Sequence, residues 1–121
     1  MSGGPKNGQE WERLAESFLQ RRGLKTLERN YYCRAGEIDL VMHDRQTLVF
    51  VEVRYRRSDS HGSGAESVGI SKQRKLIRTA QSFLQAKPHH PATACRFDVV
   101  SIGRKQGRPL IDWIRNAFDT N

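Results

Sequence analysis

Two stretches of the chain place apolar residues with the 3.6-residue period of an amphipathic helix. The first follows Asn7, which can cap a helix, with Glu10 three residues on completing a capping box. It runs as far as Gly23, a typical helix stop. The second starts at Ser71, which we expect to be its N-cap. The stripes consist of Trp11, Leu14, Ala15, Phe18 and Leu19 in the first helix, and of Leu76, Ile77, Ala80, Phe83 and Leu84 in the second.

Runs rich in β-branched and aromatic residues predict strands elsewhere. We expect strands at 24–33, 37–42, 47–56 and 97–102, and a short strand or helix at 110–118. The connecting segments are a polar turn at 43–46, a long Ser/Gly-rich loop at 58–70, a linker bracketed by Pro88 and Pro91, and a basic turn at 103–108. This order predicts one α/β domain over residues 1–121, with a mixed central sheet flanked by helices. Residues 1–8 are Gly-rich and expected to be disordered.

The second and third strands carry carboxylates within apolar runs. Side chains alternate between the two faces of a strand. In the strand at 37–42, this puts Glu37, Asp39 and Val41 on one face and Ile38, Leu40 and Met42 on the other. In the next strand, Leu48, Phe50, Glu52, Arg54 and Arg56 share a face, opposite Val49, Val51, Val53 and Tyr55.

The turn between these strands sets their register. If residues 43–46 form the loop, Met42 pairs with Thr47, Asp39 lies opposite Phe50, and Glu37 lies opposite Glu52. Asp39 and Glu52 are then diagonal neighbours on one face, roughly 7–8 Å apart at Cα and within reach of one bridging ion. A slip of one residue would separate them onto opposite faces.

Glu52 interrupts the apolar run LVFVEV, where an unpaired carboxylate is costly. Asp39 beside it adds like-charge repulsion, and a divalent cation would relieve both. Oxygen ligands alone suit Mg²⁺ or Mn²⁺ rather than zinc. The alternative is a salt bridge in which Arg54 or Arg34 neutralises Glu52.

The helices add candidates. Glu12 falls at the border of the first apolar stripe and can reach the sheet edge as a third carboxylate; alternatively it is a solvated first-turn Glu favoured by the helix dipole. In the second helix Gln73 points into the apolar arc and Lys72 lies at its edge, unless Lys72 extends to the surface. Arg74 and Arg78 point outward, towards phosphates or water.

The charge of the chain narrows the choice of partner. Its 121 residues carry 21 Lys and Arg against 13 Asp and Glu, a formal net charge of +8, which favours a polyanion. No segment approaches the roughly 20 apolar residues of a membrane span. The first ten residues lack the apolar core of a secretory signal, and Cys33 and Cys95 are expected to be free thiols, so we expect a cytoplasmic protein.

Several segments together resemble the bacterial YraN family: NGQEWERLAESFL, ERNYYCRAGEIDLVM, LVFVEVRYRR, SKQRKLIRTAQSFL and RFDVVSI. The resemblance covers roughly residues 8–118. That family is similar to the PD-(D/E)XK, restriction-endonuclease-like superfamily and to archaeal Holliday-junction resolvases. The resemblance therefore implies a three-layer restriction-endonuclease-like fold. It implies Asp39, Glu52 and Glu12 as ligands of Mg²⁺ or Mn²⁺, and Gln73 as a polar helix residue at the site.

The superfamily's lysine falls on Arg54, and Ile38 stands where the motif name leads one to expect a proline. Arginine cannot act as a base, although it can stabilise charge on a phosphate. We expect a metal-dependent endonuclease acting on DNA rather than RNA, on branched or repair intermediates, with a homodimer as one possible assembly. Asp39, Glu52, Arg54 and Gln73 would be catalytic. Backbone phosphates would contact Arg56, Arg57, Lys72, Arg74, Arg104 and Lys105.

Two other functions stay open. The first is a catalytically silent nucleic-acid-binding module of the same fold, which the change from Lys to Arg54 favours. The second is an interaction protein whose basic faces meet an acidic partner.

Overall fold

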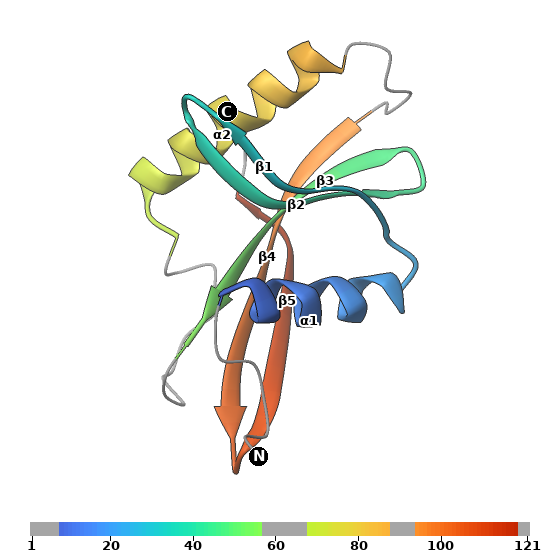
Figure 1. Cartoon of the computed structure of the whole chain (residues 1–121), viewed down its shortest axis with the longest axis vertical. Helices are drawn as coiled ribbons and strands as arrows, with labels where there is room; N and C mark the ends of the chain where they lie inside the picture. The colour runs from blue at the N-terminus through green and yellow to red at the C-terminus, as the bar shows by residue number, and fades with distance from the viewer. Residues whose placement is uncertain (1–7, 57–67, 88–93, 119–121) are drawn as a thin grey trace.

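A computed structural model describes residues 8–56, 68–87 and 94–118. Its elements are α1 (Gly8–Gln20), β1 (Lys25–Cys33), β2 (Gly36–Asp44), β3 (Thr47–Tyr55), α2 (Ile70–Ala86), β4 (Ala94–Lys105) and β5 (Arg108–Phe118). The strands form one five-stranded sheet in the order β1-β2-β3-β4-β5, parallel between β3 and β4 and antiparallel elsewhere (Figure 1). The predicted α/β fold with a mixed sheet is confirmed.

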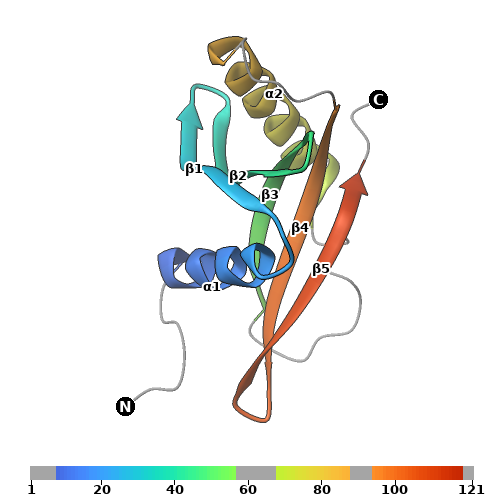
Figure 2. The same ribbon diagram turned by 90° about the vertical axis from the view of Figure 1, so that its right-hand side faces the viewer.

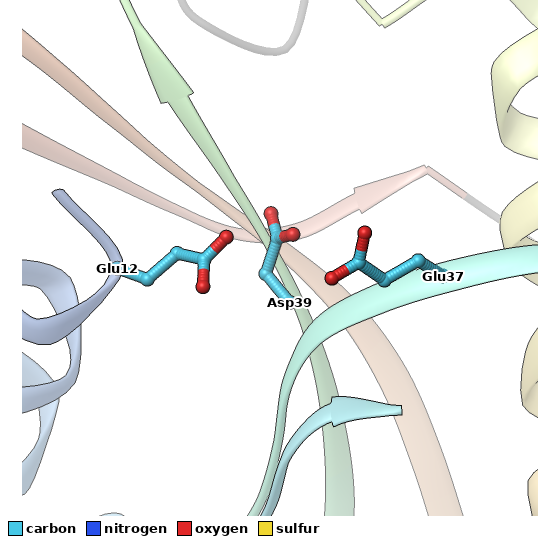
Figure 3. Close-up of side chains that lie close together, drawn as sticks. All are labelled: Glu12, Glu37 and Asp39. Atoms are coloured by element: carbon cyan, nitrogen blue, oxygen red, sulfur yellow. The ribbon is translucent and has the colours of Figure 1, made fainter. Parts of the chain in front are cut away.

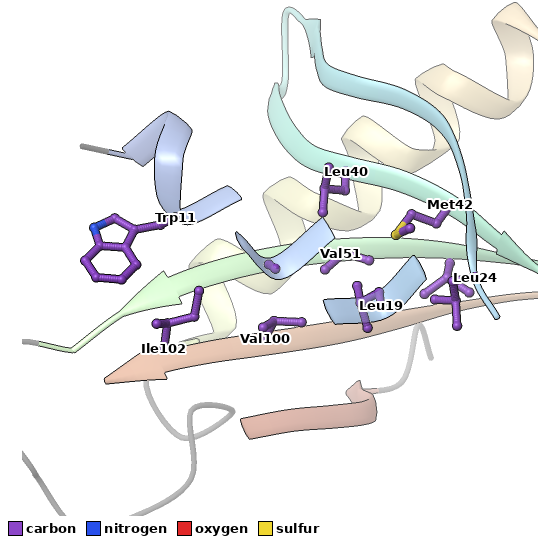
Figure 4. Packing of buried hydrophobic residues seen from close by; sticks show 10 residues of the cluster. Trp11, Leu19, Leu24, Leu40, Met42, Val51, Val100 and Ile102 are labelled. Carbon is purple, nitrogen blue, oxygen red and sulfur yellow. The ribbon is translucent and has the colours of Figure 1, made fainter. Parts of the chain in front are cut away.

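The two helices cover opposite faces of the sheet, and this produces three layers (Figure 2). Val49 and Val51 of β3 face α1, whereas the alternate residues Leu48 and Phe50 face α2. The α1 side contains Trp11, Ala15, Leu19, Leu24, Leu40, Met42, Val49, Val51, Val100 and Ile102 (Figure 4). The α2 side contains Ile38, Val41, Leu48, Phe50, Val68, Leu76, Ala80, Phe83, Phe97 and Val99. This layering is consistent with the restriction-endonuclease-like fold that the resemblance implied.

The β2–β3 hairpin is tighter than the sequence pattern predicted. The strands continue to Asp44 and Thr47, which pair directly, so only residues 45 and 46 form the turn. Arg45 adopts a φ of 59°, as a two-residue hairpin turn requires. Met42 therefore lies opposite Val49, and the predicted pairing with Thr47 is wrong by two residues. A shift of two does not by itself move any side chain to the other face.

The strict alternation predicted for β2 fails at Asp39. Ile38 was expected beside Leu40, but Ile38 packs on the α2 side and Leu40 on the α1 side. The last residue pair assigned between β2 and β3 is Leu40 with Val51. Beyond it, the Asp39 carboxylate accepts a hydrogen bond from the Val53 N–H at 2.8 Å, so a side chain stands where backbone would continue the ladder. The β1–β2 pair consequently bends away from β3 towards α2 (Figures 1 and 2).

Several predicted boundaries change. The second helix is capped by Gly69 and not by Ser71, and the tail at 110–118 belongs to a strand, β5. Cys33 and Cys95 are free, as expected. The predicted Asn7 cap, the segment 57–67 and the linker between Pro88 and Pro91 lie outside the described residues. Within the described part of the chain, no helix is long and apolar enough to cross a membrane.

A buried carboxylate fixes the edge strand β5. Asp98, only 1% exposed, accepts hydrogen bonds from the Arg96 side chain, from the Trp113 indole N–H at 2.9 Å and from the Asn116 N–H at 2.9 Å. We expect Trp113→Phe to lower the free energy of unfolding by about 1.5–3 kcal/mol, because a hydrogen bond to a buried charge is lost. Urea denaturation measures this. Tyr55→Phe, which keeps its ring stacked on Trp11 at a position that is 39% exposed, is the control, and equal stability of both variants would contradict the prediction.

Candidate functional site

Asp39 marks the point where β2 separates from β3. Two other carboxylates approach it there: Glu12 from the first turns of α1 and Glu37 from the beginning of β2 (Figure 3). One oxygen of each of the three side chains lies within 4.8 Å of the others. We call Glu12, Glu37 and Asp39 the acidic triad.

Asn30 of β1 holds two members of the triad. Its amide Nδ2 donates to Glu12 Oε1 and to Glu37 Oε2, both at 2.8 Å. The backbone of Asn30 has a φ of 50°, a left-handed conformation that Asn tolerates better than most residues. One amide thus ties the helix to the sheet.

The position of Glu12 depends on its neighbour. Trp11 is buried and stacks on Tyr55 of β3, with ring centroids 4.2 Å apart, which fixes the start of α1 against that strand. Glu16, one turn further along α1, has its own cation: Arg29 Nη2 lies 2.8 Å from its carboxylate. Glu16 therefore belongs to a structural ion pair with Arg29, whereas Glu12 is part of the acidic triad.

Glu52 lies beside the triad and has cationic partners. The side chain is 7% exposed, and its Oε2 lies 2.9 Å from Lys72 Nζ and 3.9 Å from Arg54 Nη1. The sequence suggested Arg54 or Arg34 as the neutralising partner. Lys72, from the first turn of α2, makes the shorter contact.

Two adjoining hollows open at this place, and Asp39, Glu52 and Lys72 line both. The larger has a volume of about 450 Å³ and lies against α2, with Glu37 on one wall and Ser71 and Lys75 on the other. The smaller, about 340 Å³, lies between α1 and the end of β3 and is lined also by Gly8, Trp11, Glu12, Val53, Arg54 and Tyr55. Carboxylates and ammonium groups thus face a shared space.

The electrostatics of the site are unfavourable to a charged Asp39. Burial raises its pKa, the negative charge of Glu52 raises it further, and Glu12 and Glu37 add to the effect. The hydrogen bond from Val53 opposes these influences, yet the pKa reaches about 8. Asp39 therefore retains a proton near neutral pH unless a positive charge joins the triad.

The predicted site residues fall into three groups. Glu12, Asp39, Glu52, Arg54 and Lys72 line the hollows. Gln73 does not line them; its side chain donates to the Val68 carbonyl at 2.9 Å, where it completes the start of α2. The remaining predicted phosphate-binding residues lie elsewhere: Arg74 is exposed on α2, Arg56 pairs with Asp112 at 3.3 Å, Arg104 and Lys105 are on the β4–β5 hairpin, and Arg57 is outside the described residues.

Glu37 and Asn30 were not among the predicted site residues. Period-two geometry did place Glu37 on the face of Asp39, so a signal for it was present. For Asn30 the signal was weaker: an Asn within an irregular strand, of the residue type that most readily adopts a positive φ.

The fold and the triad define a class: α/β proteins with a mixed sheet that opens at an acidic, cation-lined hollow. Within that class, residues 11–102 match the model of the uncharacterised protein family UPF0102, and the chain belongs to this family. Similar relatives are UPF0102 proteins of Stutzerimonas stutzeri (50% identical, 99% of this chain and 100% of the relative) and Nitrosococcus oceani (49%, 92% and 90%). A third, from Aeromonas hydrophila, is 50% identical over 94% of this chain and 85% of its own.

Proposed function

We propose that this protein hydrolyses phosphodiester bonds of nucleic acid, with DNA as the substrate, in a reaction that depends on Mg²⁺ or Mn²⁺. The observation that carries the proposal is the raised pKa of Asp39 inside the acidic triad. The carboxylates of Glu12, Glu37 and Glu52 surround that of Asp39, and the repulsion among these four groups opposes folding. A divalent cation would turn this repulsion into attraction.

The donor set fits such an ion. The triad offers oxygen ligands only, which suit Mg²⁺ and Mn²⁺. Glu12, Glu37 and Asp39 would hold it, with Glu52 adjacent. When bound, the ion would lower the pKa of a coordinated water and polarise a phosphoryl oxygen.

The cations of the site would act on the phosphate. Lys72 Nζ lies 2.9 Å from Glu52 at the boundary of both hollows, so it is oriented by that carboxylate and still half exposed. A diester drawn into the hollow would meet this ammonium and the Arg54 guanidinium. Both would stabilise negative charge that develops on the phosphate oxygens.

The rest of the proposal concerns setting and partners. The formal net charge of +8 supports a polyanionic partner, and the two free thiols suit the reducing bacterial cytoplasm. Branched intermediates of recombination or repair are the substrates we propose first, on which a homodimer would make paired cuts.

A second candidate function has an observation of its own. Glu52 already has two cationic partners, as expected if this carboxylate is structural. Under this alternative the protein is a catalytically silent nucleic-acid-binding module, with Arg54 and Lys72 serving to neutralise Glu52.

Cleavage assays separate the two functions. We would incubate the protein with branched, flapped, duplex and single-stranded DNA and with RNA, in Mg²⁺, in Mn²⁺ and in EDTA. Metal-dependent cleavage by the wild type is expected, and Glu37→Gln should lose it because one triad ligand is removed. Glu28→Gln makes the same chemical change elsewhere on the sheet and should cut normally. If the protein binds these nucleic acids but cleaves none of them, hydrolysis is refuted and the silent module is supported.

A further inference from the structure

The β4–β5 hairpin continues beyond the end of its neighbour β3. The last residue pair between β3 and β4 is Tyr55 with Ile102. Beyond that point β4 and β5 still pair with each other, through Gly103 with Leu110 and on to Lys105 with Arg108. We call residues 103–110 the hairpin arm. Both ribbon views show it projecting away from the two helices (Figures 1 and 2).

The arm is a well-defined structure. Its two turn residues, Gln106 and Gly107, have φ values of 53° and 78°, the positive values that a type I′ turn requires. Arg104 Nη1 donates to the Gly107 carbonyl at 3.3 Å, which ties the turn to its own strand. The guanidinium of Arg104 also lies 5.7 Å from the ring centre of Trp11, so the arm contacts the start of α1.

The surface of the arm carries charge of one sign. Arg104, Lys105 and Arg108 lie within it, and the sequence has no Asp or Glu between Gly103 and Ile111. Lys105 and Arg108 are exposed, and Leu110 is 45% exposed. An edge hairpin that served only to complete the sheet would not need three cations around its turn. This pattern suits a polyanion with a recess that admits the hairpin.

The dimensions of the arm match the major groove of B-form DNA. Three residues of strand from Gly103 to Lys105 extend about 10 Å at about 3.3 Å per residue. The major groove is roughly 12 Å wide and 8.5 Å deep, and it admits a two-stranded β-ribbon. In A-form RNA this groove is too narrow for side chains, and a single strand has no groove.

We infer that the hairpin arm enters the major groove of duplex DNA, where Arg104, Lys105 and Arg108 contact the phosphates that border it. The inference rests on the proposed function only in that the partner is a nucleic acid. Trp11 contacts the arm, and Glu12, the next residue in the chain, belongs to the triad. Because both residues line the smaller hollow, a duplex bound to the arm would lie next to that hollow. The arm thus selects duplex DNA over duplex RNA and single strands.

Binding in EDTA tests the arm without any cleavage step. The wild type is compared with a variant carrying Arg104→Gln, Lys105→Gln and Arg108→Gln, by fluorescence anisotropy on a labelled DNA duplex, an RNA duplex of the same sequence and single-stranded DNA. We expect the wild type to bind the DNA duplex at least tenfold more tightly than the other two. The variant should lose at least tenfold on the DNA duplex, and the slope of log affinity against log salt should fall by about 2–3, near 0.9 per lost phosphate contact.

A charge-matched control is Arg21→Gln, Lys25→Gln and Arg45→Gln, three exposed cations away from the arm. It should bind the DNA duplex like the wild type. The double variant Lys105→Gln and Arg108→Gln keeps the Arg104–Trp11 contact, so its loss of affinity cannot come from a displaced α1. Equal losses in the arm variant and the control, or equal wild-type affinity for all three nucleic acids, would overturn the inference. Duplex selection without metal-dependent cleavage would uphold the arm and refute hydrolysis, whereas cleavage without duplex selection would do the reverse.

Discussion

Replacing Asp39 by Asn is expected to make the metal-free protein more stable at pH 9 and, at the same time, to abolish metal-dependent cleavage. Stability rises because above its pKa of about 8 the wild-type carboxylate is charged amid burial and the charges of Glu52, Glu12 and Glu37. Asn removes that charge while its amide oxygen can still accept the hydrogen bond from Val53. The gain should be on the order of a few kcal/mol. Thermal unfolding would detect it as a rise of several degrees in Tm.

The rate of cleavage should fall at least about a hundredfold, which is the usual effect of removing one group that stabilises charge in the transition state. Glu28→Gln is the control, because that carboxylate lies on β1 outside the triad and has only a distant, exposed partner, Lys87 Nζ at 3.9 Å. It should change neither Tm nor cleavage. If Asp39→Asn lowered Tm at pH 9, or cut as fast as the wild type, the assignment of Asp39 as a strained, ion-binding carboxylate would fail.

The second large effect is the pH dependence of metal affinity. Below pH 8 the metal-free protein holds a proton on Asp39, which an incoming cation must displace. The affinity for Mn²⁺ should therefore rise about tenfold per pH unit from pH 6 and level off above pH 8, as expected for one released proton. Isothermal titration calorimetry in two buffers of different ionisation enthalpy would count that proton.

The stability of the metal-free protein should move in the opposite direction. The folded pKa of Asp39, about 8, is raised above its ordinary value of 3.8. The protonated acid thus favours the folded state fully below about pH 4, and this contribution is lost as pH rises towards 8. Saturating Mn²⁺ should reverse the trend at high pH, because it binds only the folded, deprotonated triad. A Mn²⁺ affinity that is flat between pH 6 and 8 would contradict the binding of the ion by an Asp39 whose pKa is raised.

Local patterns in the sequence were enough to predict the elements and the faces of β3. Alternation identified Glu52 as a carboxylate within an apolar run, and the structure places it at 7% exposure with a cation beside it. The error in the hairpin came from the turn: a polar segment at 43–46 reads equally as a four-residue loop or as a two-residue turn with one more strand residue on each side. Only Arg45, with its positive φ, decides between them.

The composition of the triad depends on contacts between distant segments, and periodicity carries no information on these. Period-two spacing placed Glu37 on the face of Asp39, but the bend of β2 at Asp39, which breaks the alternation at Ile38, is not predicted by spacing. Lys72 meets Glu52 because the crossover between two parallel strands delivers the first turn of α2 to that place. Neither the bend nor the docking of α2 follows from spacing along the chain.

The hydrogen bond between Asp39 and Val53 has a consequence for other chains of this architecture. The side chain that carries the site's charge is also the side chain that parts two strands, so shape and chemistry depend on the same position. A chain with no catalytic activity would still need a short side chain that accepts a hydrogen bond at the position of Asp39 to keep its sheet open, and Asp or Asn would serve equally. An acid at this position, without the other two members of the triad, therefore does not distinguish an active chain from a silent one. Acids at the positions of Glu12 and Glu37, which part no strands, are the informative ones.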